Sequence, residues 1–268
     1  MSGADDYINK LIETAPLRET VIRDAINYLN LPEGSFGLDA GCGIGLHLPM
    51  LADAIGKDSH IVGLDLSTDF LKHAQSFVKE SGVRTKITFQ KGDVSHLPFD
   101  NDTFDWVWSV DCIGYAPMDL LPILKELSRV VKPGGVIVIL AYSSQQFFPG
   151  YPELEAKLNA TTSGIAPFTK GSSPKKHFLN SLHWLEKAGL VDCTARTFIS
   201  NVVVPLSDAI RKAMLSLIQM RWDDNELSPE DSELFRRLTD PDSPEYILYR
   251  RDYHGFFTYT MFFGQVPE

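Results

Sequence analysis

The sequence predicts a doubly wound α/β fold with a largely parallel sheet. Short β-type runs alternate with amphipathic helical stretches between residues 36 and 140, which favours right-handed βαβ units covered by helices on both faces. The first of these runs ends in a glycine-rich turn that opens a helix. The chain has 268 residues and is 44% apolar, so it can bury a sizeable core without metal or disulfide staples.

The first elements follow from the spacing of apolar residues. Apolar side chains recur at i, i+3 and i+4 in residues 5–30, which predicts helical structure interrupted near Pro16 and an N-terminal helical cap over residues 1–30. The β-type runs that follow are 36–40, 60–66, 87–90, 104–109 and 136–140. The amphipathic stretches between them cover about 45–56, 67–81 and 118–131.

After Ala141 the amino-acid composition changes and the alternation of strand and helix patterns stops. Residues 143–176 are rich in Ser, Pro, Gly, Thr and Lys, with a short helical patch near 153–159, which predicts a lid. A helix near 177–188 and a strand near 191–199 come next, and a helical insertion is expected over 205–251. The last strand, 255–266, has apolar residues in both phases, so we expect burial on both faces. The core domain would therefore comprise residues 31–204 and 252–268.

The charge balance limits the partners. The net charge of −10 disfavours nucleic acid, because phosphate binding needs a basic face. Nine acids against Arg236 and Arg237 in residues 223–245 supply −7 of that charge, and a solvated helical hairpin is favoured there over an acidic docking surface.

Cysteine usage and hydropathy indicate the compartment. Cys42, Cys112 and Cys193 are widely spaced, which indicates neither a disulfide framework nor a metal site, and a reducing cytosol is the natural setting. No apolar signal segment opens the chain and no run of eighteen apolar residues occurs, so we expect a cytoplasmic protein without a membrane span.

The strongest motif is the run Leu-Asp-Ala-Gly-Cys-Gly-Ile-Gly at residues 38–45, at the end of the first strand. Glycines at such a turn let the backbone approach a ligand, and the free N–H groups at the helix start favour a polar or anionic group. A dinucleotide site would need GxGxxG, but the sixth position is Leu46 in one register and Leu48 in the other. The run matches D-x-G-x-G-x-G instead.

That pattern resembles the first motif of the Rossmann-like (class I) S-adenosylmethionine-dependent methyltransferases, and later segments agree with that family in order and spacing. Asp65 ends the second strand, where the family's acid accepts both ribose hydroxyls. Asp93 follows the third strand, where the family's acid receives the adenine amino group. The segments Leu97–Phe99, Phe104–Asp105 and Leu127–Gly135 resemble the family's entries into strands four and five.

The resemblance implies S-adenosyl-L-methionine as cofactor and a sheet that ends in an antiparallel pair of strands, for which 191–199 and 255–266 are candidates. The cofactor-binding residues that we expect from it are Asp39, Gly41, Cys42, Gly43, Asp65, Leu66, Asp93, Val94 and Ser109.

The segment after the fourth strand is where cofactor and acceptor should meet. Asp111 loosely resembles an acid of sterol and tocopherol C-methyltransferases that takes up a proton or stabilises a developing cation, so it is the catalytic candidate. The alternative is that Asp111 caps the next turn or binds the cofactor's amino group. Tyr115, Tyr142 and His254 are candidates for lining the acceptor pocket, although isolated tyrosines are more often packing residues.

We therefore expect methyl transfer to a small-molecule acceptor at C, O or N. The aromatic residues of the C-terminal third suggest an apolar or aromatic acceptor, and core packing explains most of them equally well. Two alternatives stay open: a catalytically silent cofactor-binding module, and a nucleotide-dependent oxidoreductase, which the missing GxGxxG disfavours. Protein or tRNA methylation is disfavoured by the acidity of the chain.

Overall fold

The computed structural model describes residues 3–268, and the chain so described divides into two compact units. The sheet unit comprises Ile22–Tyr142, Ser173–Phe198 and Tyr259–Glu268. The second unit comprises the segment up to Val21 together with Ser143–Ser172 and Ile199–Thr258. The functional division into cap, core, lid and insertion stays a prediction.

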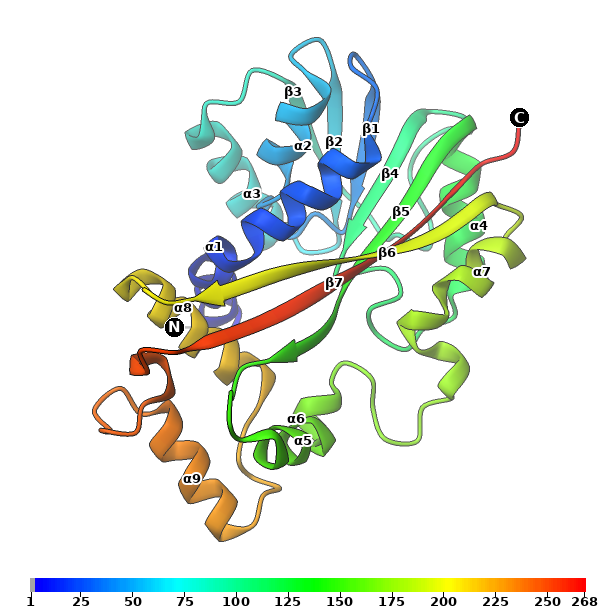
Figure 1. Cartoon of the computed structure of the whole chain (residues 1–268). Helices are drawn as coiled ribbons and strands as arrows, with labels where there is room; N and C mark the ends of the chain where they lie inside the picture. The colour runs from blue at the N-terminus through cyan, green and yellow to red at the C-terminus, as the bar shows by residue number, and fades with distance from the viewer. Residues whose placement is uncertain (1–2) are drawn as a thin grey trace. The chain divides into compact units, whose positions relative to one another are not determined.

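The strands of residues 3–268 form one seven-stranded sheet with the order β3-β2-β1-β4-β5-β7-β6 (Figure 1). Their bounds are β1 Phe36–Ala40, β2 His60–Asp65, β3 Lys86–Lys91, β4 Phe104–Val110, β5 Val131–Gln146, β6 Val191–Val203 and β7 His254–Gln265. Strands β1 to β5 pair in parallel, with Leu38 opposite both Val62 of β2 and Val107 of β4. Because strand order reverses on either side of β1, the carboxyl ends of β1 and β4 mark the switch point at which such sheets bind ligands.

Strand β7 runs antiparallel to β5 and pairs on its other side with β6, so the sheet ends in the pair of strands that the resemblance implied. The N–H of Gly134 donates to the carbonyl of Val266, and the N–H of Val266 donates to the carbonyl of Gly135. On the other side of β7, the hydroxyls of Thr197 and Thr260 lie 3.0 Å apart. Residues 259–262 of β7 are buried in both phases, which confirms the expected burial on both faces.

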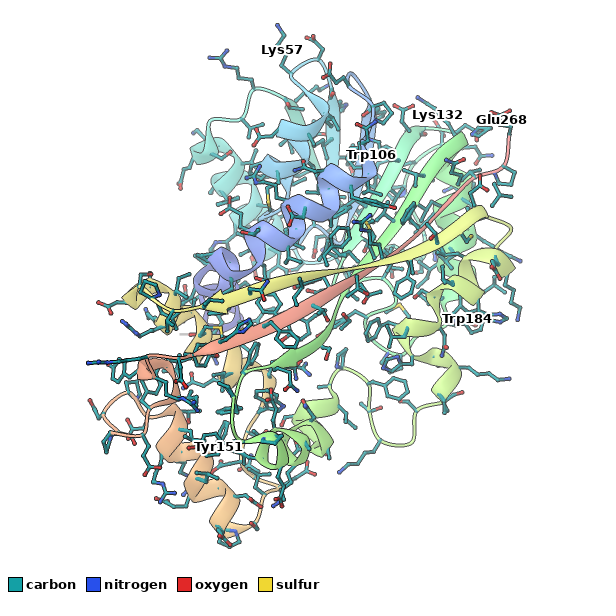
Figure 2. The ribbon with its side chains drawn as sticks, viewed as in Figure 1. Lys57, Trp106, Lys132, Tyr151, Trp184 and Glu268 are labelled. Atoms are coloured by element: carbon teal, nitrogen blue, oxygen red, sulfur yellow. The ribbon has the colours of Figure 1, made fainter. Side chains whose placement is uncertain are left out.

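The helices of the sheet unit bury their apolar faces against the strands. Helix α4 (Leu120–Val130) begins at Asp119, whose carboxylate accepts from Leu121 N, and lies beside α7 (Ser181–Lys187) on one core cluster with β1, β4 and β5 (Figure 1). Helices α2 (Leu48–Ile55) and α3 (Thr68–Ser81) follow β1 and β2. Trp106 of β4, labelled in Figure 2, is fully buried, and its indole N–H donates to Ser35 Oγ at 2.9 Å.

The predicted interruption near Pro16 is wrong, because α1 runs without a break from Gly3 to Leu29. Pro16 removes the N–H that would bond to the carbonyl of Ile12. Ile12 is 51% exposed, so this face of the helix meets solvent, while buried Leu17 and Val21 anchor the turn that follows. Packing of the apolar stripe thus outweighs the loss of one helical hydrogen bond.

The second unit contains most of the helical segments expected in the lid and in the insertion. Helices α5 (Pro152–Ala160) and α6 (Thr162–Ile165) occupy the predicted lid, and α8 (Asp208–Arg221), α9 (Pro229–Thr239) and the 3₁₀ turn Ile247–Tyr249 occupy the predicted insertion. Strand β5 continues to Gln146, so residues 143–146 are extended strand and not loop. The short 3₁₀ turns Pro174–Lys176 and Phe178–Asn180 precede α7. None of the helices in the described range is long and apolar enough to cross a bilayer.

Candidate cofactor-binding site

The glycine-rich turn after β1 is held close to the end of β2. The N–H groups of Gly41 and Cys42 both donate to the carbonyl of Leu64, at 2.8 and 2.9 Å. Gly41 has φ +83, and a Cβ added there would lie 2.3 Å from the sulfur of Cys112. Gly43 has φ +55, and a Cβ added there would meet nothing within 4 Å. The first glycine therefore permits close packing, whereas the second has open space in front of it, where a ligand could lie.

Asp65 connects this turn to the start of α3. Its Oδ2 accepts from the N–H of Gly43 at 2.9 Å, and its Oδ1 accepts from the N–H of Ser67 at 2.8 Å. The Asp65 residue is only partly buried. Because each carboxylate oxygen has two lone pairs, both oxygens retain the capacity to accept a hydroxyl from outside the protein. The carboxylate is thus held in a fixed orientation and can still accept two further hydrogen bonds.

Asp39 lies on β1 immediately before the turn and is 1% exposed. Its Oδ2 is buried and has no hydrogen-bond partner within residues 3–268. Burial raises the pKa of Asp39 to about 8, and the neighbouring Asp65 carboxylate adds to the rise. A buried carboxylate oxygen without a donor is costly, so this position fits a ligand that brings a cationic or hydrogen-bond-donating group.

Asp93 follows β3 and is exposed. Its Oδ1 accepts from the backbone N–H and from the hydroxyl of Ser95, both at 2.8 Å, and these two bonds hold the pKa of Asp93 below its usual range. The Oδ2 of Asp93 makes no hydrogen bond within the described chain. Val94, next in the chain, is half-buried. The carboxylate of Asp93 is therefore ionised, oriented and open to a donor such as an exocyclic amino group.

Asp111 begins the segment after β4 in a left-handed conformation, with φ +48. Its Oδ1 accepts from the N–H of Tyr142 at 2.8 Å, and its Oδ2 accepts from the hydroxyl of Tyr259 at 2.8 Å. The two tyrosine rings meet edge to face, with centroids 5.6 Å apart. Asp111 thus connects the end of β4 to residues within β5 and β7, which gives it a structural role beside any chemical one.

The remaining candidates occupy different surroundings. Ser109 is fully buried in β4 and its hydroxyl accepts from the N–H of Ile113, while Leu66 is 66% exposed beside Asp65. Cys42 is buried against Gly63, and burial raises the pKa of its thiol, so it is a packing residue with poor nucleophilicity. Tyr115 is half-buried in the turn after β4.

His254 belongs to the second unit. Its Nε2 lies 3.2 Å from Oδ1 of Asn201. The other candidates all belong to the sheet unit, so a role for His254 in the acceptor pocket stays a prediction.

Two residues near the site, Tyr259 and Cys112, belong to no motif by which the sequence could identify them. Tyr259 is 148 positions from Asp111 in the sequence and becomes its donor only because β7 lies next to β5. The side chain of Cys112 packs so closely against Gly41 that only glycine fits at position 41. Burial raises the pKa of the Cys112 thiol to about 12. A pattern search treats both as ordinary strand and turn residues.

Comparisons with known proteins agree with this geometry. Residues 38–135 match a family model described as a methyltransferase domain. The demethylmenaquinone methyltransferase of Bacillus subtilis is 41% identical over 120 residues, which are 45% of this chain and 51% of that protein. The chain thus spans about half the length of the curated relatives it matches.

Solved structures extend the likeness to most of the chain, at the level of fold. A provisionally assigned methyltransferase from Bacillus halodurans C-125 aligns with a TM-score of 0.56 at 17% identity, covering 92% of this chain and 99% of that one. Phosphoethanolamine N-methyltransferase 2 of Haemonchus contortus, solved with S-adenosyl-L-methionine, aligns with a TM-score of 0.53 at 21% identity, covering 92% of this chain and 52% of that one. The sheet order and the glycine turn with Asp65 agree with these matches, so residues 38–135 are similar to a methyltransferase domain and the chain has the fold of the solved methyltransferases.

Proposed function

We propose that this protein is an S-adenosylmethionine-dependent methyltransferase that acts on a small-molecule acceptor. The observation that carries the proposal is the pair Asp39 and Asp65 at the switch point of the sheet: one carboxylate is buried with an oxygen that lacks a donor, and the other is held by Gly43 and Ser67 with lone pairs to spare. This arrangement suits a ligand with both a cationic amino group and a ribose.

The residues present fit the cofactor group by group. Asp65 would accept the two ribose hydroxyls, and Oδ2 of Asp93 would accept the adenine amino group with the Val94 backbone beside it. Asp39 would accept the α-ammonium of the methionine moiety, which supplies the donor that its Oδ2 lacks. Gly41, Cys42 and Gly43 would let the backbone approach the ligand, and Leu66 and Ser109 complete the proposed lining.

When bound, the cofactor supplies an electrophilic methyl group on a sulfonium. The contribution of the chain would be chiefly orientation, since positioning of two reactants is worth on the order of 7–11 kcal/mol. Asp111 could take a proton from an acceptor that must lose one. Alternatively, its role is only structural, through the hydrogen bonds that it accepts from Tyr142 and Tyr259. Tyr115, Tyr142 and His254 remain proposed acceptor contacts.

The acceptor is proposed only as a class. The curated relatives are named demethylmenaquinone methyltransferases, and their likeness covers less than half of this chain. We infer a small apolar or aromatic acceptor from the aromatic residues of the second half, and we expect the protein to work in the cytoplasm.

Calorimetric titration of the purified protein with S-adenosylhomocysteine tests the proposal, with NADH and NADPH as parallel ligands. Micromolar binding of S-adenosylhomocysteine with no heat from the nicotinamides is the expected result. Preference for a nicotinamide would replace the proposal by an oxidoreductase. Binding followed by no methyl transfer to any compound of a phenol, quinol and amine panel would favour the silent cofactor-binding module.

A further inference from the structure

A cavity of about 360 Å³ opens in the second unit, outside every segment that the sequence motifs single out. Its lining comes from the chain after β6, from α8 and from the turn that precedes β7. Arg211, Arg250 and Arg251 line it together with the ring of Tyr249. Such a gathering of arginines is unexpected in a chain whose net charge is −10.

The cavity combines an apolar floor with a cationic rim. Leu206 and Leu248 contribute to the lining and are 7% and 1% exposed, whereas Tyr249 is 57% exposed. The guanidinium carbon of Arg211 lies 5.5 Å from the centre of the Tyr249 ring, within the range of a cation–π contact. A small ligand could thus place an apolar part against the leucines and an anionic part at the rim.

Two of the three arginines are already paired with acids. Arg250 donates from Nε and a terminal nitrogen to both carboxylate oxygens of Asp252, and its other terminal nitrogen donates to the carbonyl of Pro149. A terminal nitrogen of Arg211 lies 2.6 Å from the carboxylate of Asp208. These pairs hold the two guanidinium groups in place and neutralise their charges.

Two sets of donors remain unused. The Nε of Arg211 is buried without a hydrogen-bond partner in the described part of the chain. Arg251 is exposed and makes no hydrogen bond or ion pair with any described residue. The rim therefore has one positive charge in excess, on Arg251, whose exposed planar guanidinium has unfilled N–H donors that match phosphate oxygens.

We propose that this cavity is a binding site for a small phosphate ester with an apolar or aromatic substituent. The phosphate contacts the guanidinium of Arg251, and the substituent lies against Tyr249 and the leucine floor. The site is built from residues of the second unit alone, so it does not depend on the proposed methyl transfer.

The test uses phenyl phosphate and inorganic phosphate as probes on the full-length protein, by calorimetry without any cofactor. We expect saturable binding of phenyl phosphate, about tenfold weaker in Arg251→Gln. Arg84→Gln is the matched control, because Arg84 is another exposed arginine without a described partner and lies in the sheet unit, and it should leave the affinity unchanged. Tyr249→Ala should weaken phenyl phosphate about fivefold and leave inorganic phosphate nearly unchanged.

Several outcomes would overturn the proposal. Absence of saturation at millimolar phenyl phosphate would do so, as would an equal loss of affinity in Arg84→Gln, which would indicate only diffuse attraction to positive charge. Benzoate bound as tightly as phenyl phosphate would show a carboxylate site instead. A different result would support the proposal and identify the source of the phosphate. If the protein sediments with phosphatidylglycerol vesicles and Arg251→Gln abolishes this binding, the phosphate belongs to a lipid headgroup.

Discussion

The hydroxyl of Tyr259 donates to Oδ2 of Asp111 at 2.8 Å, and the other carboxylate oxygen accepts from the N–H of Tyr142. One side chain at the end of β4 is thereby bonded to β5 and β7. Tyr259 is 1% exposed, so its hydroxyl has little access to water if this bond is lost.

Tyr259→Phe is expected to lower the free energy of unfolding by about 1–3 kcal/mol, because it leaves a carboxylate oxygen without its donor. Tyr28→Phe, at a residue that is 43% exposed and whose ring contacts with Phe198 and Phe263 the variant keeps, is the matched control and should cost much less. Urea unfolding of the two variants measures the difference. Equal small losses would mean that the Tyr259 hydroxyl bond contributes nothing net.

Asp111→Asn separates the chemical role of Asp111 from its structural one. The amide oxygen can still accept from Tyr142 N and the amide N–H₂ can donate to the Tyr259 oxygen, so we expect the fold and S-adenosylhomocysteine binding to persist. Turnover should fall at least about tenfold if the carboxylate handles a proton. Unchanged turnover with intact binding would show that Asp111 only joins the strands, and loss of binding would assign it to the cofactor.

The two glycines of the turn should respond differently to alanine. Gly41→Ala combines φ +83 with a Cβ 2.3 Å from the Cys112 sulfur, so we expect a loss of more than about 2 kcal/mol in stability. Gly43→Ala keeps φ +55 but meets nothing, and should cost about 1 kcal/mol of backbone strain. Thermal unfolding gives the order. If Gly43→Ala also lowers affinity for S-adenosylhomocysteine, the space in front of it belongs to the ligand.

Asp65→Ala should weaken S-adenosylhomocysteine binding by about 2–4 kcal/mol, roughly 30- to 800-fold, because both ribose hydroxyls lose their acceptor. Asp69→Ala is the control: Asp69 is an exposed acid in the first turn of α3 that pairs only with Lys72 at 3.0 Å among the described residues. Calorimetry of both variants, with circular dichroism to check the fold, gives the comparison. An unchanged dissociation constant in Asp65→Ala would show that the ribose is bound elsewhere.

The sheet and much of the cofactor region could be predicted because their signals are local. The glycine turn, the acid that ends β2 and the acid after β3 each lie within a few residues of the strand that positions them. The partner of Asp111 could not be predicted, since Tyr259 reaches it only through the insertion of β7 between β5 and β6. Pro16 misled the helix prediction because tertiary burial outweighed a local helix-breaking signal. The arginine cavity likewise joins segments that share no motif.

Glu155 offers a test in the second unit. Its two oxygens accept from the backbone N–H groups of Phe147 and Phe148, at 2.7 and 3.3 Å, and burial raises its pKa. Glu155→Ala leaves both buried N–H groups without an acceptor and should cost about 2–4 kcal/mol in the free energy of unfolding. Glu155→Gln keeps one acceptor and should recover part of that loss. Equal stability of the two variants would contradict the role assigned to these bonds.

Asp39 should make both stability and cofactor binding depend on pH. Its pKa rises from 3.8 to about 8 on folding, so between these values the folded state retains a proton that the unfolded chain releases. The free energy of unfolding should therefore fall as pH rises from about 4 to about 8 and level off above that range. Asp39→Asn, which does not titrate, should remove this slope, whereas the exposed control Asp69→Asn should retain it.

The same proton links pH to the ligand. An ammonium group that pairs with Asp39 favours the ionised carboxylate, so the affinity for S-adenosylhomocysteine should increase between about pH 6 and 8, and binding at pH 7 should release a proton. Titrations in buffers of different ionisation enthalpy count that proton, and Asp39→Asn should abolish its release. If the variant releases the same number of protons as the wild type, another group carries the linkage and Asp39 does not hold the ammonium.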